Sequence, residues 1–424
     1  MKADRLTYYR LDKNNSVYKL ANFFELLKVQ SDDICNFEDS FYECLSDILS
    51  LSISHGFYGN LWHLAITNIL INHENAYSLS CEMTGDVGGP ISKTAFLDFE
   101  ILFDLFNSDL SQFDSYFSYD YVSLTNFDAR DNKGYKFNSR IRDRIIELNI
   151  ALENYKDALE FQNQVALFYK GYGVGLLGLH KAFRIEEGGV IVPVTNITHV
   201  KLDNLIGYDY QKEQLLTNTL AFLNGKKANN CLLFGDAGTG KSTCIKAICN
   251  EFYDDGLRLI EIYKHQLKDI HHVIAQIKSR KFKFIIYMDD LSFEEFETEY
   301  KYLKAVIEGG LEKKPDNVLI YATSNRRHLI RESFKDKDDM DDLHKNDTVQ
   351  EKLSLSYRFG VTIYFGSPNK KEFNEIVLGL KEANNLKIDD ETLLLEANQW
   401  ELSHGGLSGR CAQQFIDYLL GKTS

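Results

Sequence analysis

One eight-residue segment constrains the fold of this chain more than any other. Residues 235–242 read Gly-Asp-Ala-Gly-Thr-Gly-Lys-Ser and match the pattern G-x-x-x-x-G-K-[ST] at every fixed position. The segment directly follows an apolar run, residues 231–234, and directly precedes a helical run, residues 244–252. A strand, a glycine-rich turn and a helix in this order surround a phosphate with backbone N–H groups and a helix N-terminus. We therefore expect an α/β domain built around a phosphate-binding loop.

The residue types within this loop suit the phosphates of a nucleotide. Glycines let the backbone curl so that successive N–H groups point at phosphate oxygens. Lys241 brings a positive charge to the outer phosphates, and the hydroxyl of Ser242 suits Mg²⁺. The expected nucleotide contacts from the loop are Gly235, Asp236, Ala237, Gly238, Thr239, Gly240, Lys241, Ser242 and Thr243.

The second half of the chain alternates strand candidates with helical segments. The strand candidates are residues 231–234, 257–263, 284–288, 318–322 and 361–365. Five apolar strands separated by helices predict a parallel sheet covered on both faces. From residue 369 onward only amphipathic helices are expected. The glycine-rich segment 170–194 is interpreted as a hinge before this domain.

Polar residues follow two of the expected strands. Residues 284–288 end in Asp289 and Asp290, and we assign Asp289 to the metal ion and Asp290 to the attacking water. A solvated strand end is the alternative, and Glu294 and Glu295 compete with Asp290 for the water. The strand 318–322 leads to Asn325, which suits the lytic water or a γ-phosphate oxygen, because strand carboxyl ends line the ligand crevice of such sheets.

Two arginines complete the candidate set. Arg358 lies just before the fifth strand, where it suits the nucleotide of a neighbouring subunit, and an arginine supplied in this way contributes about 10³ to 10⁵ in rate. Arg410 opens the final helical segment, where it suits the γ-phosphate of its own subunit. For each arginine the alternative is a surface ion pair worth under about 1 kcal/mol.

Together these residues resemble the AAA+ ATPases, whose phosphate loop, metal strand, first sensor, trans arginine and second sensor occur in the same order. The resemblance covers roughly residues 196–420. Several blocks are more closely similar to a bacterial AAA+ group catalogued only as a domain of unknown function, family eight-one-five. These blocks are Gly207-Tyr208 and residues 289–294, 303–305, 308–310, 322–329 and 353–356.

The resemblance implies a fold, cofactors and partners. It implies a nucleotide-binding core at 196–367, a helical lid at 368–424, bound ATP and Mg²⁺, and assembly into a homo-oligomer. Asn325 is then the first sensor, Arg358 the trans arginine and Arg410 the second sensor, while Ile206 and Gly207 contribute to an adenine pocket. The chain departs from the family in two ways. It has Asp-Asp where most active members have Asp-Glu, and around Tyr263 it lacks an aromatic pore loop, so processive threading of polypeptide is not expected.

Composition narrows the remaining classes of function. The 48 basic and 62 acidic residues give a net charge of −14, which disfavours a general nucleic-acid coat. No apolar run approaches the roughly 20 residues of a membrane span, and the N-terminus lacks the apolar stretch of a signal peptide, so a cytoplasmic location is expected. The seven cysteines are scattered, without C-x-x-C spacing, and are expected to be free buried thiols.

Residues 1–195 are expected to form a mainly helical domain for client recognition or assembly. Its helical-period runs are residues 23–29, 96–107 and 141–169. The aromatic stretch 113–121 carries Asp114 and Asp120 rather than basic residues, which favours core packing or a protein-binding groove over base stacking. The basic triplet Arg140, Arg142 and Arg144 is interpreted as a solvated helix face.

Three further patterns are weaker. Residues 173–178 match G-x-G-x-x-G without a preceding strand, so a chance match in the hinge is the better interpretation. His271 and His272 lack a third ligand at metal-site spacing. The charged segment 335–347 does not follow the spacing of a Ca²⁺ loop, so a solvated loop is favoured over a site for a cation or a basic partner. A separate hypothesis is that ordering of this loop at a subunit interface couples assembly to hydrolysis.

Two functions remain open. The first is an ATPase that remodels or loads a protein or protein–nucleic-acid complex. The second is an ATP-dependent switch or scaffold with little turnover, which the shorter Asp290 favours. A small-molecule phosphotransferase is disfavoured, because the sequence shows no acceptor pocket and carries both candidate arginines.

Overall fold

The computed structural model describes residues 3–30, 32–86, 88–130, 134, 137–195, 197, 200–294, 297–308, 314–327, 329–330 and 355–422. The chain divides into two compact units, Met1–His180 and Lys181–Ser424. The first boundary therefore falls before Lys181 rather than after residue 195 as expected. The physical reason is that two strands within residues 182–193 pair into the sheet of the second unit.

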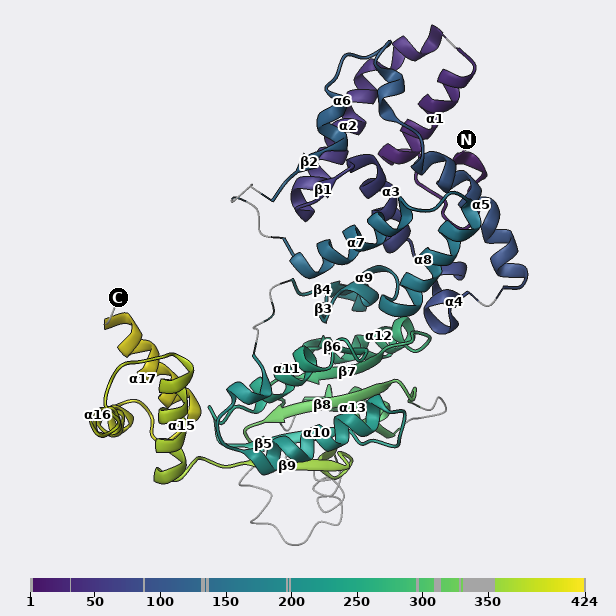
Figure 1. The fold of residues 1–424 in the computed structure, drawn as a ribbon. Coiled ribbons are helices and arrows are strands. Elements are labelled where there is room, and N and C mark those ends of the chain that lie inside the picture. Colours follow the sequence, from purple (N-terminus) through teal and green to yellow (C-terminus); the bar gives the residue numbers. More distant parts are fainter. Residues whose placement is uncertain are drawn as a thin grey trace. The chain divides into compact units, whose positions relative to one another are not determined.

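The first unit is mainly helical, as the sequence predicts (Figure 1). The expected run 141–169 is two helices, α7 and α8, because Asp157 caps a new helix by accepting from the N–H groups of Leu159 and Glu160. The unit also has one short antiparallel strand pair. Its elements are α1 (Ser16–Lys28), α2 (Glu38–His55), β1 (Tyr58–Gly59), α3 (Leu61–Asn72), α4 (Ala76–Thr84), α5 (Pro90–Phe106), α6 (Tyr121–Thr125), β2 (Phe127–Asp128), α7 (Ser139–Leu152), α8 (Ala158–Tyr172) and α9 (Gly175–Leu179).

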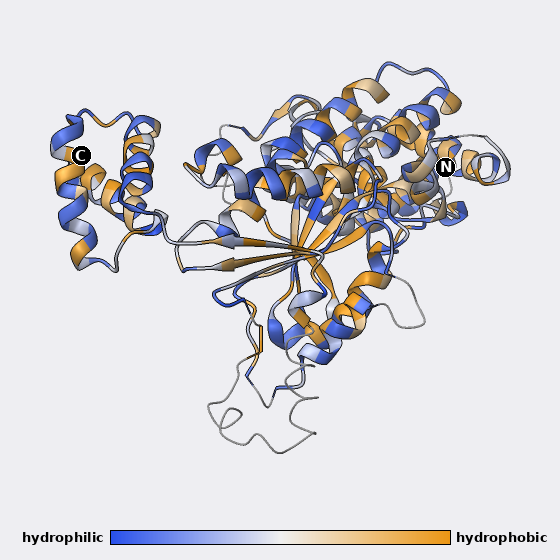
Figure 2. Cartoon of the chain, turned by 90° about the horizontal axis from the view of Figure 1, so that it is seen from below, coloured by the Kyte–Doolittle hydropathy of each residue, from blue (hydrophilic) through white to orange (hydrophobic). Residues whose placement is uncertain are grey.

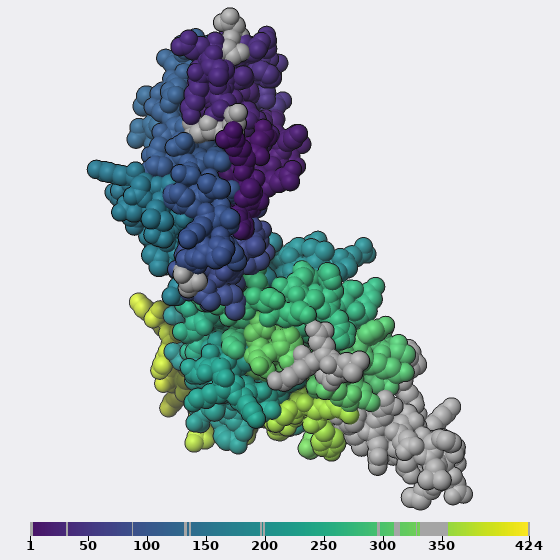
Figure 3. Space-filling view, turned by 90° about the vertical axis from the view of Figure 1, so that its right-hand side faces the viewer, coloured from purple at the N-terminus to yellow at the C-terminus, as the bar shows by residue number. Residues whose placement is uncertain are grey.

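Aromatic side chains form much of the core of this unit, whose outer surface is purple to blue in Figure 3. Phe113 and Phe117, from the aromatic stretch of the sequence, are almost fully buried. Both rings contact Phe41 of α2, with centroids 5.1 and 4.5 Å away. Core packing therefore accounts for these two residues. The G-x-G-x-x-G match falls at α9 with a helix before it, as the chance interpretation requires.

A buried carboxylate anchors the N-terminal segment to α5. Asp98 is fully buried and accepts from the backbone N–H groups of Thr7, Tyr8 and Tyr9 over 2.7–3.0 Å. The Thr7 hydroxyl donates to it as well, at 3.0 Å. A buried charge is stable only when such donors replace its water. Asp98 is therefore a structural residue of the first unit.

The second unit is built on a seven-stranded sheet in the order β4-β3-β6-β7-β8-β5-β9. Six strands are parallel, and β4 is antiparallel to β3 at one edge. All five expected strands are present, and β3 and β4 replace part of the expected hinge. The strands are β3 (Ala182–Ile185), β4 (Ile191–Pro193), β5 (Cys231–Gly235), β6 (Leu257–Glu261), β7 (Lys283–Met288), β8 (Val318–Ser324) and β9 (Val361–Phe365).

Helices cover the sheet, whose strands are strongly apolar (Figure 2). Apolar residues of α10 and α11 share one core with alternate strand residues such as Leu233, Ile285 and Tyr321. The last three helices form a separate small core around Phe373 and Phe415. This confirms the predicted α/β class with a C-terminal helical region. The helices are α10 (Asp209–Leu223), α11 (Lys241–Glu251), α12 (Ile270–Ile277), α13 (Tyr300–Glu308), α15 (Lys370–Ala383), α16 (Asp390–Ser403) and α17 (Gly409–Lys422).

We expect Asp98→Asn to lower the free energy of unfolding of the first unit by about 2 kcal/mol, because hydrogen bonds to a charged acceptor are lost and N–H groups stay buried. Trp62 is buried in this unit and reports its unfolding. Urea titration followed by Trp62 fluorescence in a Trp400→Phe background measures the change. Asp104→Asn, an exposed position on the same helix, is the control. Equal midpoints for the two variants would contradict the role of Asp98.

Candidate nucleotide-binding site

The phosphate-binding loop joins the carboxyl end of β5 to α11, as expected from the sequence. Gly235 has φ of +133°, and a Cβ there would lie 2.1 Å from the Phe365 carbonyl oxygen of β9. Only glycine fits so close an approach. The next residue, Asp236, donates its N–H to that same oxygen at 2.9 Å. The start of the loop is therefore fixed by the neighbouring strand.

Two loop residues shape the loop from inside. The carboxylate of Asp236 accepts from the N–H and hydroxyl of Ser367, at 2.7 and 2.8 Å, which holds the pKa of Asp236 below its usual value. Thr239 is buried and donates its hydroxyl to the Asp236 carbonyl at 2.9 Å. The side chain of Asp236 thus ties the loop to the segment after β9.

Lys241 is the most constrained charge in the site. Its side chain is buried, and Nζ donates to the carbonyl oxygens of Gly235 and Asp236 at 2.8 and 2.5 Å. Nζ also donates to Oδ1 of Asn325 at 3.3 Å. Burial lowers the pKa of Lys241 against the opposing effect of the nearby carboxylates, and Arg410 lowers it further. A buried ammonium beside a second cation favours an anion as the remaining partner.

Asp289 directly follows β7 and lies next to the start of α11. Its Oδ1 accepts from the hydroxyls of Ser242 and Thr323, at 2.6 Å each. Burial raises the pKa of Asp289, but these hydrogen bonds outweigh it, so the net shift is downward. Asp289 is therefore held as a carboxylate next to a hydroxyl, a pair of oxygen ligands that Mg²⁺ prefers.

Asp290 takes a left-handed backbone conformation, with φ of +47°. Asn and Asp tolerate this region better than other non-glycine residues, and such strain concentrates at functional sites. The Asp290 N–H donates to the Thr323 hydroxyl at 2.9 Å, and its Oδ1 accepts from the Asn325 amide at 2.8 Å. The Asn325 amide thus bridges Lys241 and Asp290.

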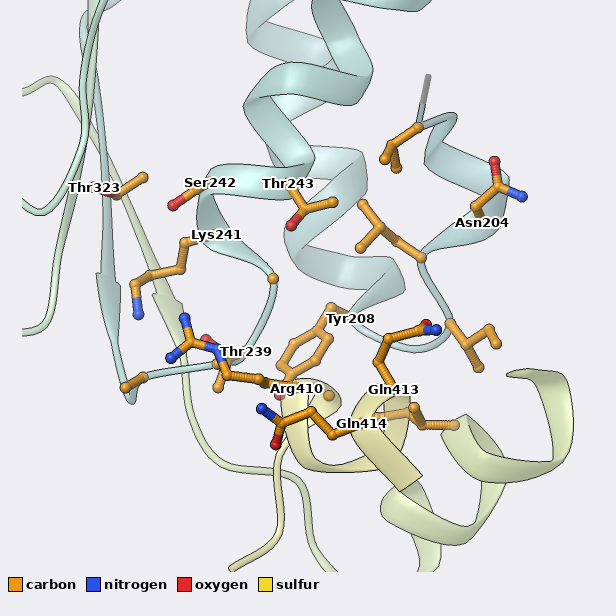
Figure 4. A pocket seen from close by; sticks show the side chains of 18 of the residues that line it. Asn204, Tyr208, Thr239, Lys241, Ser242, Thr243, Thr323, Arg410, Gln413 and Gln414 are labelled. Carbon is orange, nitrogen blue, oxygen red and sulfur yellow. The ribbon is translucent and has the colours of Figure 1, made fainter. Parts of the chain in front are cut away.

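A cavity of about 630 Å³ lies between this edge of the sheet and the C-terminal helices (Figure 4). Arg410 enters it from the N-terminus of α17, and its guanidinium lies beside Lys241 in the view. The Arg410 N–H donates to the Gly238 carbonyl at 3.0 Å. The lining residues are Val200, Asn204, Leu205, Ile206, Tyr208, Ala237, Gly238, Thr239, Gly240, Lys241, Ser242, Thr243, Asp289, Asp290, Thr323, Asn325, Ile376, Leu380, Gly409, Arg410, Gln413 and Gln414.

The apolar end of the cavity lies between Leu205, Ile206 and the helix α15. Ile206 packs closely on Gly379, because a Cβ added to Gly379 would lie 2.5 Å from Cδ1 of Ile206. Gly207, predicted beside it, has φ of +78° and turns the chain into α10. An apolar slot at this end and cations at the other suit a base and a triphosphate.

Most of the sequence-predicted residues therefore meet in one cavity. Gly235, Asp236, Gly207 and Arg358 are not among its lining residues, and neither is Glu294. Glu295 and the segment 335–347 lie outside the described residues. Sequence reasoning missed several lining residues, among them Thr323, Gln413 and Gln414. Thr323 lies near the end of β8, two residues before Asn325, a spacing that marks it as a neighbour of the site.

Arg358 lies near the amino end of β9, at the opposite end of the strands from the phosphate loop. It precedes β9, whose carboxyl end pairs with Gly235, so the length of β9 separates it from the phosphate loop. In this chain Arg358 forms an ion pair with Glu308 at the end of α13. Its position keeps it away from the phosphate loop of its own chain.

The residues present fit a nucleotide with a divalent cation. The first N–H groups of α11 have no acceptor within the helix and open onto the cavity, next to Lys241 and Arg410. Ser242 and Asp289 supply hard oxygen ligands. Among the described residues no cluster of three or more His, Cys, Asp or Glu side chains forms another metal site, and His271 and His272 are exposed. All seven cysteines are free, and all but Cys35 are buried.

A family model described as "Protein of unknown function (DUF815)" matches residues 179–423. The chain belongs to the DUF815 family. The predicted resemblance to this group is confirmed. The match begins just before Lys181, so DUF815 corresponds closely to the second unit, with β3 and β4 included.

Two solved structures of RuvB mutants from Thermotoga maritima match part of the chain at low similarity. The first is 16% identical with a TM-score of 0.38, over 52% of this chain and 65% of that one. The second is 14% identical with a TM-score of 0.34, over 52% and 72%. No curated protein matches the chain. Across the described part of the chain, no helix is both long and apolar enough to cross a membrane.

We expect Lys241→Met to lower ATP affinity at least about tenfold, because a hydrogen bond from a charged donor contributes roughly 1.5–3 kcal/mol. Without nucleotide the variant should unfold at no lower a temperature than the wild type. The reason is that a lowered pKa in the folded chain means that folding disfavours the ammonium. Thermal unfolding with and without ATP measures both effects. Lys371→Met, on the exposed surface of α15, is the control, and a large loss of stability without ATP would contradict this account of Lys241.

Proposed function

We propose that this protein is an ATPase that binds Mg-ATP between the sheet and its C-terminal helices. The observation that carries the proposal is the meeting of Lys241, the Ser242–Asp289 pair and the Asn325–Asp290 pair at one end of the cavity. Each of these groups has a chemical role in phosphoryl transfer. They lie close together because the parallel strands that precede them end on the same side of the sheet.

In the proposed reaction Asp290 orients the attacking water. Its carboxylate accepts a hydrogen bond from the Asn325 amide, so the two side chains lie next to each other in the site. Lys241 and Arg410 stabilise charge on the outer phosphates. Mg²⁺, held by Ser242 and Asp289, would neutralise charge on the β- and γ-phosphates. The apolar slot at Ile206 would take the base.

Arg358 is proposed to act on the nucleotide of a neighbouring copy, which makes the active site shared in a homo-oligomer. The ion pair with Glu308 holds the guanidinium at the sheet edge where β9 begins. The energy released by hydrolysis would serve to remodel or load a protein complex held by residues 1–180. A cytoplasmic location remains part of the proposal.

A switch with little turnover is the second candidate. The observation that favours it is the left-handed conformation of Asp290, which is compatible with the short Asp and disfavours a longer side chain. Nucleotide occupancy would then set the assembly state, with the same residues binding ATP. The two functions differ in rate rather than in ligand.

We expect Asp290→Asn to bind ATP normally and to lower the rate of hydrolysis by about 10²- to 10⁴-fold, the range for a lost general base. Asn tolerates left-handed φ and keeps an oxygen for the Asn325 amide, so the fold of the site is retained. Nucleotide binding and phosphate release are measured in parallel. Asp255→Asn, at an exposed position in the turn between α11 and β6, is the control. Tight ATP binding without measurable turnover in the wild type would favour the switch.

We expect the specific ATPase rate to rise with protein concentration and Arg358→Ala to lose this rise while binding ATP. A trans arginine is worth about 10³ to 10⁵ in rate. Glu308→Gln releases the ion pair but keeps the arginine, so it should retain the rise. Lys301→Ala on the same helix α13 is the surface control. A rate that stays flat with concentration and is indifferent to Arg358 would remove the shared-site part of the proposal.

A further inference from the structure

We infer that Thr323 is a positioning residue that fixes the metal carboxylate and the water-orienting carboxylate relative to each other. This inference rests on the proposed function of the site. Thr323 is 1% exposed and lies in β8, next to β7, which carries Asp289 and Asp290 beyond its end. Neither the sequence pattern nor the family description assigns it a role.

The hydroxyl of Thr323 makes two hydrogen bonds of opposite sense. It donates to Oδ1 of Asp289 at 2.6 Å and accepts from the N–H of Asp290 at 2.9 Å. A hydroxyl has one hydrogen and two lone pairs, so it can hold both partners at once. One atom therefore connects the side chain of the first carboxylate residue to the backbone of the second.

The backbone of Thr323 adds a third contact. Its carbonyl oxygen accepts from the N–H of Leu291 at 2.7 Å. Thr323 thus accepts hydrogen bonds from the backbone N–H groups of both Asp290 and Leu291. These two bonds fix the backbone before and after the Cα of Asp290. These contacts account for the persistence of the left-handed conformation at Asp290, because strained backbone needs surroundings that fix it.

The arrangement has a consequence for the chemistry. Ser242 and Thr323 both donate to the same Asp289 oxygen, which leaves the lone pairs of Ser242 available to a metal ion. A side chain that orients a metal ligand in this way typically changes metal affinity or activity 10- to 100-fold when it is removed. Thr323 acts through Asp289 and Asp290 and needs no contact with the nucleotide.

The test compares Thr323→Val, which keeps the shape but lacks the hydroxyl, with Thr323→Ser, which keeps it. The measured quantity is the ratio of ATP affinity in Mg²⁺ to that in EDTA, together with kcat. We expect Thr323→Val to keep its ATP affinity in EDTA, to lose about 10- to 100-fold of the Mg²⁺-dependent gain and to lower kcat. Thr323→Ser should restore both. Thr362→Val, at an exposed position of β9, is the matched control.

Each outcome decides one point. An unchanged Mg²⁺-dependent gain and kcat in Thr323→Val would overturn the inference, provided that the wild type binds and hydrolyses ATP. Failure of the wild type to bind ATP would instead overturn the proposed function. If Thr323→Val does not fold, Thr323→Cys supplies a similar volume with only a weak hydrogen-bonding thiol, and the same loss is expected from it. Wild-type values in Thr323→Cys would then overturn the inference.

Discussion

The burial of one positive charge organises the cavity at the end of β5. Lys241 places an ammonium where water cannot reach it freely, so its three hydrogens must find oxygen atoms of the protein. Two of these are carbonyls of the loop itself, and the third is the amide oxygen of Asn325, just beyond the end of β8. The loop after β5 and the segment after β8 therefore meet at one charge. That charge stays only partly compensated, which is the state expected of a site that accepts an anion.

The two carboxylates are separated by backbone conformation as much as by chemistry. Asp289 follows β7 and accepts from Ser242, whereas Asp290 has a left-handed backbone and accepts from Asn325. Asp at the second position is therefore a local preference of this backbone. Asp at residue 290, which departs from Asp-Glu, is compatible with this left-handed backbone. A Glu at residue 290 would place a longer side chain on a strained backbone.

The sequence predicts the strands and most of the site, because the patterns that encode them are local. Apolar runs mark the five central strands, and glycines with Lys241 and Ser242 mark the loop between a strand and a helix. It does not predict β3. The residues of β3 lie in a glycine-rich segment that looks like a linker, and pairing with β6 across more than 70 residues of chain makes them a strand. Thr323 is missed for a similar reason, since its partners come from another strand. Gln413 and Gln414 enter the cavity only because α17 docks there, which no local pattern encodes.

The position of Arg358 limits how copies of this chain can associate. Strands β5 and β9 are parallel and in register from Cys231–Val361 to Gly235–Phe365, so the phosphate loop and Arg358 lie at opposite ends of the same strand pair. Five strand residues span about 16 Å, which is too far for an arginine to reach back to its own site. If Arg358 completes a nucleotide site, the edge that carries it must face the cavity of a different copy. A contact between two unlike surfaces is heterologous, and repetition of such a contact closes into a ring or continues as a filament. A two-fold dimer that buried the two Arg358 edges against each other would leave both cavities without the arginine.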